Sequence, residues 1–225
     1  MKLTKLLALG LVTFSLTSCL SDDDDENNET TYQFTDYLNY NLAGTQVTTD
    51  DGTTYSVSNA SDVSSVTSKL TDMRALSIFS VTYDSSGAMK SGFTILYMYD
   101  CFILNSCAKA DVPTLARDGF YSFESDKSGL SSKYLNLYCY IGYFGDSIQA
   151  DDFYLYPTDV TGNTVTLQLS YDPGSEGDTS MQFGYQAVSI DLSTALKSVG
   201  YAAGQTVNVI LNSSSGTISG EYTVR

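Results

Sequence analysis

The cysteines have the most reactive chemistry in the sequence, and the chain has four of them. A catalytic thiol or a Ser-His-Asp site needs a base, and the chain has no histidine to provide one. Cys101 and Cys107 are separated by a short segment containing an Asn-Ser turn, so we expect a disulfide between them in an oxidising exterior. A pairing of Cys101 with Cys139 is the alternative. The apolar face on which Cys139 lies favours a buried free thiol for that residue.

The fourth cysteine, Cys19, ends a segment with the features of a lipoprotein signal. Two lysines precede an apolar stretch over residues 6–16, which is too short to span a bilayer as a helix. The sequence Leu16-Thr17-Ser18-Cys19 then resembles a bacterial lipobox, whose cysteine is acylated and becomes the mature N-terminus. We therefore predict a signal peptide over residues 1–18 and a lipid anchor at Cys19, with an ordinary secretory peptide as the alternative.

An acidic segment follows the predicted anchor directly. It contains four consecutive aspartates and two glutamates, which repel one another and have no apolar surface to bury. We interpret residues 19–31 as the lipidated cysteine with an extended tether, because such a flexible segment lacks the preset geometry of a Ca²⁺ site. An Asp run at this place resembles the export signal of Bacteroidetes lipoproteins. The expected location is the outer membrane, facing the cell exterior.

Tyrosines are the second group with candidate chemistry, since the chain has 18 of them and no tryptophan. Tyr134, Tyr138 and Tyr140 alternate with the apolar residues of one predicted strand, so we expect them on its outward face. A flat ring with a hydroxyl suits stacking on a sugar or filling a protein interface. The alternative is that these tyrosines simply fit a pleated strand.

Paired carboxylates could act as the acids of a hydrolase or as Ca²⁺ ligands. Asp151 and Asp152 are adjacent, and adjacent residues of a strand point to opposite faces, so they cannot easily share a substrate. Asp172 and Glu176 lie in a glycine-containing segment that has the character of a polar hairpin tip. We therefore predict no catalytic residue, no metal site, no cofactor and no enzymatic activity. A carboxylate-based hydrolase is the least favoured alternative.

The charge balance excludes another class of partner. The chain has 11 Lys and Arg against 26 Asp and Glu, a net charge of −15, which repels a phosphate backbone. We therefore expect no nucleic-acid partner. Hydrophobic residues make up 42% of the chain and charged residues only 16%, which indicates a folded protein.

The elements that must position these residues are strands. Alternation of apolar and polar residues begins near Tyr32 and is interrupted by turn signals such as Asp50-Asp51-Gly52, a hairpin signal. One short helical turn is expected at residues 193–198, and at most one more around 114–117. The predicted strands include residues 75–83, 93–104, 134–143, 153–156, 164–171, 181–190, 205–211 and 217–224. This spacing predicts two all-β domains joined by a connector at residues 107–124.

The order of the motifs resembles the NigD-like lipoproteins of the Bacteroidetes. The resemblance rests on the lipobox and the Asp run, on Gly44-Thr45 before the hairpin, on Arg74 at the start of a strand, on Tyr134-Leu135-Asn136-Leu137 and on the strand at 165–169. It implies an N-terminal OB-like β-barrel over residues 32–106 and a C-terminal β-sandwich over 125–225. The association of this family with bacteriocin operons implies immunity or accessory work.

The expected function is therefore a binding or accessory role of a non-enzymatic surface lipoprotein. Its expected partners are the outer membrane, through the N-terminal lipid, and a glycan or protein ligand. A bacteriocin-associated immunity or interaction protein is the alternative.

Overall fold

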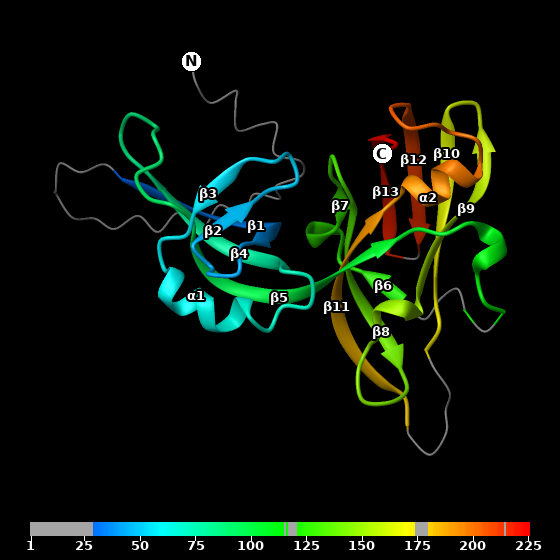
Figure 1. Ribbon diagram of the computed structural model, residues 1–225, viewed down its shortest axis with the longest axis horizontal. Coiled ribbons are helices and arrows are strands. Elements are labelled where there is room, and N and C mark those ends of the chain that lie inside the picture. The colour runs from blue at the N-terminus through cyan, green and yellow to red at the C-terminus, as the bar shows by residue number, and fades with distance from the viewer. Residues whose placement is uncertain (1–28, 115, 117–120, 174–179, 214) are drawn as a thin grey trace. The chain divides into compact units, whose positions relative to one another are not determined.

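The computed structural model describes residues 29–114, 116, 121–173, 180–213 and 215–225. The predicted signal peptide, Cys19 and most of the predicted tether lie outside these residues. The chain forms two compact units, Met1–Asp100 and Cys101–Arg225, and both are built mainly from strands (Figure 1). The predicted all-β fold class is confirmed. No helix among the described residues is long and apolar enough to cross a membrane.

The first unit is a small five-stranded barrel. Strand β1 pairs antiparallel with both β2 and β4, while β2 also pairs with β3 and β4 with β5. The predicted hairpin turn is present between β2 and β3, and it contains Gly52 at a positive φ of 89°. The elements of this unit are β1 (Thr30–Tyr40), β2 (Gln46–Thr48), β3 (Thr54–Ser56), helix α1 (Ala60–Thr67), β4 (Arg74–Tyr83) and the first part of β5 (Thr94–Asn105).

The barrel closes where β3 approaches β5. Val57, directly after β3, forms a parallel bridge with Phe93, directly before β5, and the Phe93 amide donates to the Ser56 carbonyl oxygen at 2.8 Å. A Cβ atom on Gly92 would lie 2.2 Å from that oxygen, so this approach requires glycine. With α1 between β3 and β4, the strand order matches the OB fold. The predicted OB-like barrel is confirmed.

The barrel core contains a stack of aromatic rings. The Phe93 ring lies 4.4 Å from Tyr55 and 4.3 Å from Phe79 between centroids, and Phe79 lies 5.6 Å from Phe34. Aliphatic residues of the strands, of α1 and of the segment after α1 complete the core, among them Leu38, Val47, Val63, Leu70, Val81 and Ile95.

The second unit is a β-sandwich of two sheets. In the first sheet the strand order is β5, β11, β8 and β6, with β7 also paired to β8, and in the second it is β13, β12, β10 and β9. The strands are β6 (Tyr121–Phe123), β7 (Gly129–Leu130), β8 (Leu135–Tyr143), β9 (Phe153–Thr161), β10 (Thr164–Tyr171), β11 (Gln182–Asp191), β12 (Thr206–Ser213) and β13 (Gly216–Thr223). Short helices are η2 (Lys109–Asp111), η3 (Ser125–Lys127), η4 (Ala150–Asp152) and α2 (Ser193–Ser198).

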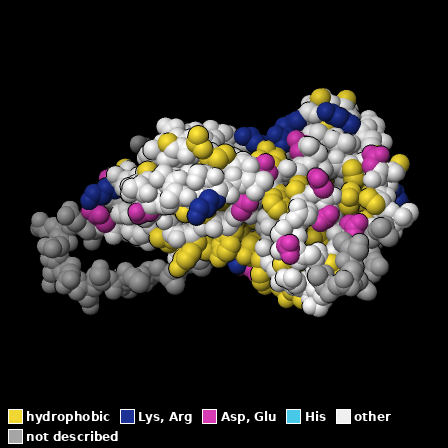
Figure 2. Space-filling view, turned by 60° about the horizontal axis from the view of Figure 1, so that its bottom comes forward, with side chains coloured by type: hydrophobic (Ala, Val, Ile, Leu, Met, Phe, Trp, Pro, Cys, Tyr) yellow, Lys and Arg dark blue, Asp and Glu magenta, His cyan; other side chains and the backbone are white. Residues whose placement is uncertain are grey.

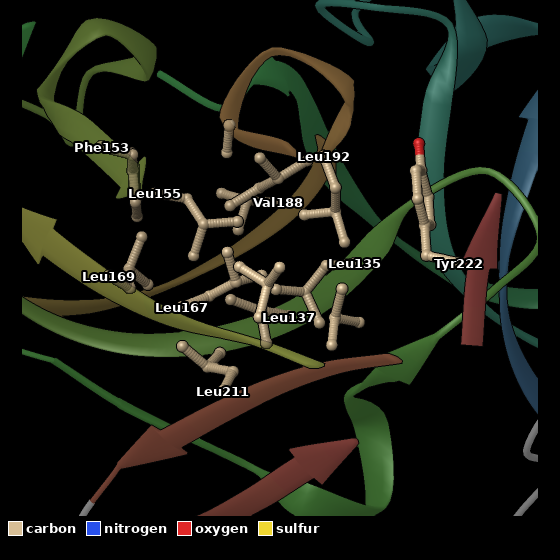
Figure 3. Packing of buried hydrophobic residues seen from close by; sticks show 14 of the residues in the cluster. Leu135, Leu137, Phe153, Leu155, Leu167, Leu169, Val188, Leu192, Leu211 and Tyr222 are labelled. Atoms are coloured by element: carbon tan, nitrogen blue, oxygen red, sulfur yellow. The ribbon is translucent and has the colours of Figure 1, made fainter. Parts of the chain in front are cut away.

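An apolar core lies between the two sheets of the sandwich. Leu137 and Val188 of the first sheet lie in one cluster with Leu155, Leu167 and Leu169 of the second (Figure 3). The apolar face predicted for β8 is confirmed, because all four of its members belong to this core: Leu135, Leu137, Cys139 and Ile141. Helix α2, also expected from the sequence, adds Ala195 and Leu196.

The division between the units differs from the predicted boundary after residue 106. Residues 94–100 of β5 pair antiparallel with β4, whereas residues 101–105 pair in parallel with β11. The division therefore falls inside one strand, between Asp100 and Cys101. The predicted connector is also shorter, since its residues 121–123 form β6 and pair with β8. The alternation pattern is continuous through β5, so it did not reveal the change of pairing partner. The helical turn expected around 114–117 falls largely outside the described residues.

Candidate functional site

An aromatic ladder lies on the outward face of the first sheet of the sandwich. We use this name for Tyr138 and Tyr140 of β8 together with Phe183 and Tyr185 of β11. The neighbouring residues of β8 point into the core, so Tyr138 and Tyr140 point away from it. Tyr140 lies opposite Tyr185 in the antiparallel pairing of the two strands, which places all four rings on one face.

The four rings are in sequential contact. The Tyr138 and Tyr185 rings stack at 5.1 Å between centroids with 13° between their planes, and Tyr140 stacks on Phe183 at 5.7 Å with 17°. The Tyr140 and Tyr185 rings lie 4.9 Å apart and are tilted by 47°. These contacts form one aromatic surface instead of four separate side chains.

The ladder is exposed at its outer end. Phe183 is 60% exposed, Tyr185 52% and Tyr140 40%, whereas Tyr138 is 6% exposed. Isolated exposed hydrophobic residues are normal on a protein, but a contiguous group on one sheet face indicates a binding surface. Exposed hydrophobic side chains also gather into patches on the face of the molecule drawn in Figure 2.

A glycine makes room for the outermost ring. Gly142 lies opposite Phe183 in the strand pairing, on the same face as Tyr140. A Cβ atom at Gly142 would come within 3.0 Å of the Phe183 ring and 2.9 Å of the Met181 sulfur. The absence of a side chain at this position therefore lets Phe183 lie close against the sheet beside Tyr140.

A charged pair borders the inner end of the ladder. Glu124 follows β6, and its amide donates to the Tyr138 carbonyl oxygen at 3.0 Å. The Lys127 ammonium of η3 lies 2.6 Å from the Glu124 carboxylate and 4.9 Å from the centroid of the Tyr138 ring. The hydrogen bond to Glu124 raises the pKa of Lys127. Partial desolvation, followed by the charge and hydrogen bond of Glu124, raises the pKa of the Tyr185 hydroxyl.

This arrangement is suited to binding. The ring of Tyr138 is contacted by the stacked Tyr185 ring and by the Lys127 ammonium, so its faces are already in use. The ladder therefore presents mainly ring edges and hydroxyls, with the most exposed ring surface at Phe183. The described contacts of the ladder do not include a nucleophilic side chain positioned by a base.

The sequence identified half of this ladder. Tyr138 and Tyr140 lie together as expected, but Tyr134 precedes β8 and its ring lies 5.3 Å from the Arg225 guanidinium. Phe183 and Tyr185 were not singled out. Their alternation along the predicted strand at 181–190 was a usable signal, but only the pairing of β11 with β8 showed which tyrosines they contact.

The described cysteines are free thiols, so the disulfide expected between Cys101 and Cys107 is not formed. Cys101 pairs with Ala187 of β11, whereas the Cys107 amide donates to the Leu155 carbonyl oxygen of β9, in the other sheet, at 2.9 Å. The Cys101 sulfur instead lies 3.3 Å from the Ser189 hydroxyl. Cys139 is buried and free as expected, and burial raises its pKa to about 12.

The acidic candidates do not converge on a metal site. Asp151 and Asp152 belong to η4, and the Asp172 amide donates to the Asp152 carbonyl oxygen at 2.9 Å. Burial, followed by the charge of Asp172, raises the pKa of Asp152. No group of three or more potential protein ligands for a metal ion occurs within the described part of the chain. Glu176 lies outside the described residues.

The barrel contains a buried charged site that sequence reasoning missed. The Arg74 guanidinium is fully buried and donates to both carboxylate oxygens of Asp50 at 2.9 Å, and to the Asn39 side-chain oxygen at 2.9 Å. The Asp36 carboxylate accepts a hydrogen bond from the Tyr37 amide at 2.7 Å. Burial raises the pKa of Asp36 to about 7. The bidentate geometry identifies Arg74 and Asp50 as structural residues of the barrel.

This chain was compared with known protein families, curated proteins and solved structures. No protein family matches the sequence, and no curated protein has significant sequence similarity to it. Among solved structures, a toxin-related protein from Parabacteroides distasonis is 15% identical, covering 84% of this chain and 91% of that one, with a TM-score of 0.48. A NigD-like immunity protein from Bacteroides caccae is 16% identical, covering 85% and 96%, with a TM-score of 0.49.

A third solved structure, of a protein of unknown function from Bacteroides vulgatus, is 11% identical and covers 86% of this chain and 91% of that one, with a TM-score of 0.42. The solved structures that are similar to this chain include one described as a NigD-like immunity protein.

Proposed function

We propose that this chain is a non-enzymatic lipoprotein of the outer cell surface that binds a protein partner through the aromatic ladder. The observation that carries the proposal is the exposure of three contiguous aromatic side chains on one face of a sheet: Tyr140, Phe183 and Tyr185. Aromatic side chains on a rigid support dominate the energetics of many protein interfaces. The apolar core behind β8 and β11 supplies that support.

The ring geometry favours a protein over a sugar as the ligand. A sugar ring stacks on the open face of an aromatic ring, but Tyr138 stacks on Tyr185, and Tyr140 stacks on Phe183 and has a tilted contact with Tyr185. A protein partner can pack against ring edges and hydrogen-bond to the hydroxyls. Glycan binding, the other ligand class expected from the sequence, has its best support in the exposed Phe183 ring.

Site-specific crosslinking tests the proposal directly. A photoreactive benzoyl-phenylalanine replaces Phe183 in cells that produce the protein, and the matched control carries it at Val160, which is 42% exposed on the other sheet. We expect protein adducts that form at position 183 and not at position 160. Equal adducts at both positions, or none at 183, would contradict protein binding by the ladder. A glycan ligand would instead give a hit on a glycan array that Phe183→Ala abolishes.

Immunity by sequestration of a toxin, which the family resemblance implies, is one form of protein binding. It predicts that deletion of the gene sensitises cells to a toxin from neighbouring bacteria. Restoration of resistance by the wild-type chain, and not by Phe183→Ala, would place that activity on the ladder. Unchanged sensitivity after deletion would exclude a toxin as the partner, and the proposed partner would then be another protein.

The anchor is tested separately. Support for it comes from the lipobox at residues 16–19 and the acidic segment that follows. Cells labelled with a clickable palmitate analogue should incorporate it into the wild-type chain and not into Cys19→Ala. Protease added to intact cells should cleave the protein. Protection of the chain while a known surface marker is cleaved would exclude the outward-facing location.

A further inference from the structure

The inner end of the aromatic ladder has an acidic border. Glu124 directly precedes η3, whose Lys127 lies against the Tyr138 ring, and Asp126 belongs to the same helical turn. Residues 101–225 as a whole carry six Lys and Arg against thirteen Asp and Glu, a net charge of −7. A negative potential of this kind attracts basic partners and repels acidic ones.

The structure already contains one cation bound at this border. The Lys127 ammonium lies between the Glu124 carboxylate, at 2.6 Å, and the face of the Tyr138 ring, at 4.9 Å from its centroid. Both partners favour a positive group, the carboxylate through its charge and the ring through its quadrupole. Lys127 comes from η3, a helical turn of three residues, and its side chain is 30% exposed. The cation is therefore held at a surface position that another molecule can reach.

We propose that the ladder binds a basic protein partner, whose arginine or lysine side chain takes the place of Lys127 between the Tyr138 ring and the Glu124 carboxylate. This inference rests on the proposed function and names the chemistry of its partner. Apolar residues of the partner pack on the edges of Tyr140, Tyr185 and Phe183. The cationic side chain gives the complex its orientation.

Arginine suits this position better than the lysine that the chain itself provides. A planar guanidinium stacks on an aromatic ring and pairs with both oxygens of a carboxylate, whereas an ammonium is a point charge that is more strongly hydrated. An arginine of the partner that displaces Lys127 therefore forms a stronger contact with the Tyr138 ring and a stronger contact with the Glu124 carboxylate than the lysine does.

The test measures binding of the purified full chain, kept in nonionic detergent, to two fluorescent peptides. One peptide alternates arginine with leucine, and its twin has glutamate in place of arginine. We expect saturable binding of the arginine peptide only.

Lys127→Ala should tighten this binding about two- to fivefold, because it removes the internal competitor from a cation–π site. Glu124→Gln should weaken it about tenfold, because the arginine of the bound peptide loses the carboxylate with which it pairs. Phe183→Ala should weaken it as well.

The controls change the same residue types away from the ladder. Lys197→Ala in α2 and Glu221→Gln in β13 are both exposed substitutions and should leave binding unchanged. Circular dichroism verifies that each variant is folded.

Three results would overturn the inference: equal or stronger binding of the glutamate peptide, no binding of the arginine peptide, or weaker binding in Lys127→Ala. Crosslinks from position 183 to a protein that lacks a basic surface would overturn only this inference. The absence of such crosslinks would overturn the proposed function itself.

Discussion

The barrel unit and the sandwich unit place their charged groups differently. In the first unit, Arg74 and Asp50 form a bidentate pair with exposures of 0% and 9%, in addition to an exposed pair of Lys90 with Glu29. In the sandwich, the described pairs Lys127–Glu124 and Arg225–Asp191 keep between 25% and 38% of each side chain exposed. The sandwich core is instead filled with aliphatic and aromatic side chains from both sheets.

This difference separates a buried use of charge from an exposed one. A buried pair must have both members present, because a single charge left behind in the interior has no solvent to stabilise it. An exposed pair contributes little to stability and can exchange its partners. The sandwich, whose core is apolar, can therefore carry Lys127 and Glu124 beside the aromatic ladder without weakening that core.

The largest expected effect comes from breaking the buried pair. Arg74→Met should lower the free energy of unfolding of the barrel by about 3–5 kcal/mol, because the Asp50 carboxylate stays buried without its partner. Urea denaturation measures the loss, and hydrogen exchange should locate it mainly in residues 29–100. The double variant Arg74→Met/Asp50→Leu should recover part of the stability.

The matched control is the exposed pair of the sandwich. Arg225→Met loses the contact to Asp191 at 3.3 Å and the hydrogen bonds of the same guanidinium to Lys133 and Tyr222, and should still cost less than about 1 kcal/mol. Equal losses in Arg74→Met and Arg225→Met would remove the distinction between the two units.

A pH dependence of the barrel is the next effect in size. Burial raises the pKa of Asp36 to about 7, whereas the pKa of an unfolded aspartate is about 3.9. Between these values the folded chain holds a proton that the unfolded chain has lost, so this group makes the free energy of unfolding fall as the pH rises from about 4 to about 7. Asp36→Asn should remove this contribution and stabilise the barrel above pH 7 by up to about 4 kcal/mol.

The comparison variant for this experiment is Asp84→Asn. Hydrogen bonds from Ser86 and Ala88 lower the pKa of Asp84, so its contribution has the opposite sign and is lost as the pH falls. Urea midpoints from pH 2 to 8 measure both variants, because the Asp84 contribution is lost only as the pH falls below about 4. If the urea midpoint of Asp36→Asn still falls with rising pH as it does in the wild-type chain, Asp36 does not cause that dependence. Asp36 is then ionised in the folded chain over this pH range.

The smallest expected effect on stability is at the ladder. Phe183→Ala removes an exposed ring and should lower the free energy of unfolding by less than about 1 kcal/mol, while weakening the binding of the arginine peptide. Leu167→Ala in the sandwich core should cost about 2–5 kcal/mol, because the cavity it leaves is fully enclosed. Thermal unfolding compares the two. A large loss in Phe183→Ala would make the ladder a structural feature.

Sequence reasoning was accurate where local pattern decides the structure. Period-two alternation located most of the long strands, and the four core residues of β8 were assigned to the correct face. Helix α1 was not predicted, because its sequence is rich in Ser, Thr and Val, which have weak helix propensity. Its burial of Val63 against the barrel core compensates for that propensity.

Errors occurred where a distant segment decides the outcome. The disulfide between Cys101 and Cys107 was expected from their short separation, but β5 extends past Cys101 because β11 pairs with it. The boundary after residue 106 failed for the same reason. Half of the ladder was missed because Phe183 and Tyr185 become part of it only through the pairing of β11 with β8.

The sequence by itself determined the all-β class of this protein and the faces of its strands, because side chains alternate strictly along an extended backbone. Only the tertiary structure decided which strands become neighbours, because pairing depends on contacts between segments far apart in the chain. That choice buried Arg74 against Asp50 in the barrel, and it gathered four rings and the Lys127 cation on one exposed face of the sandwich.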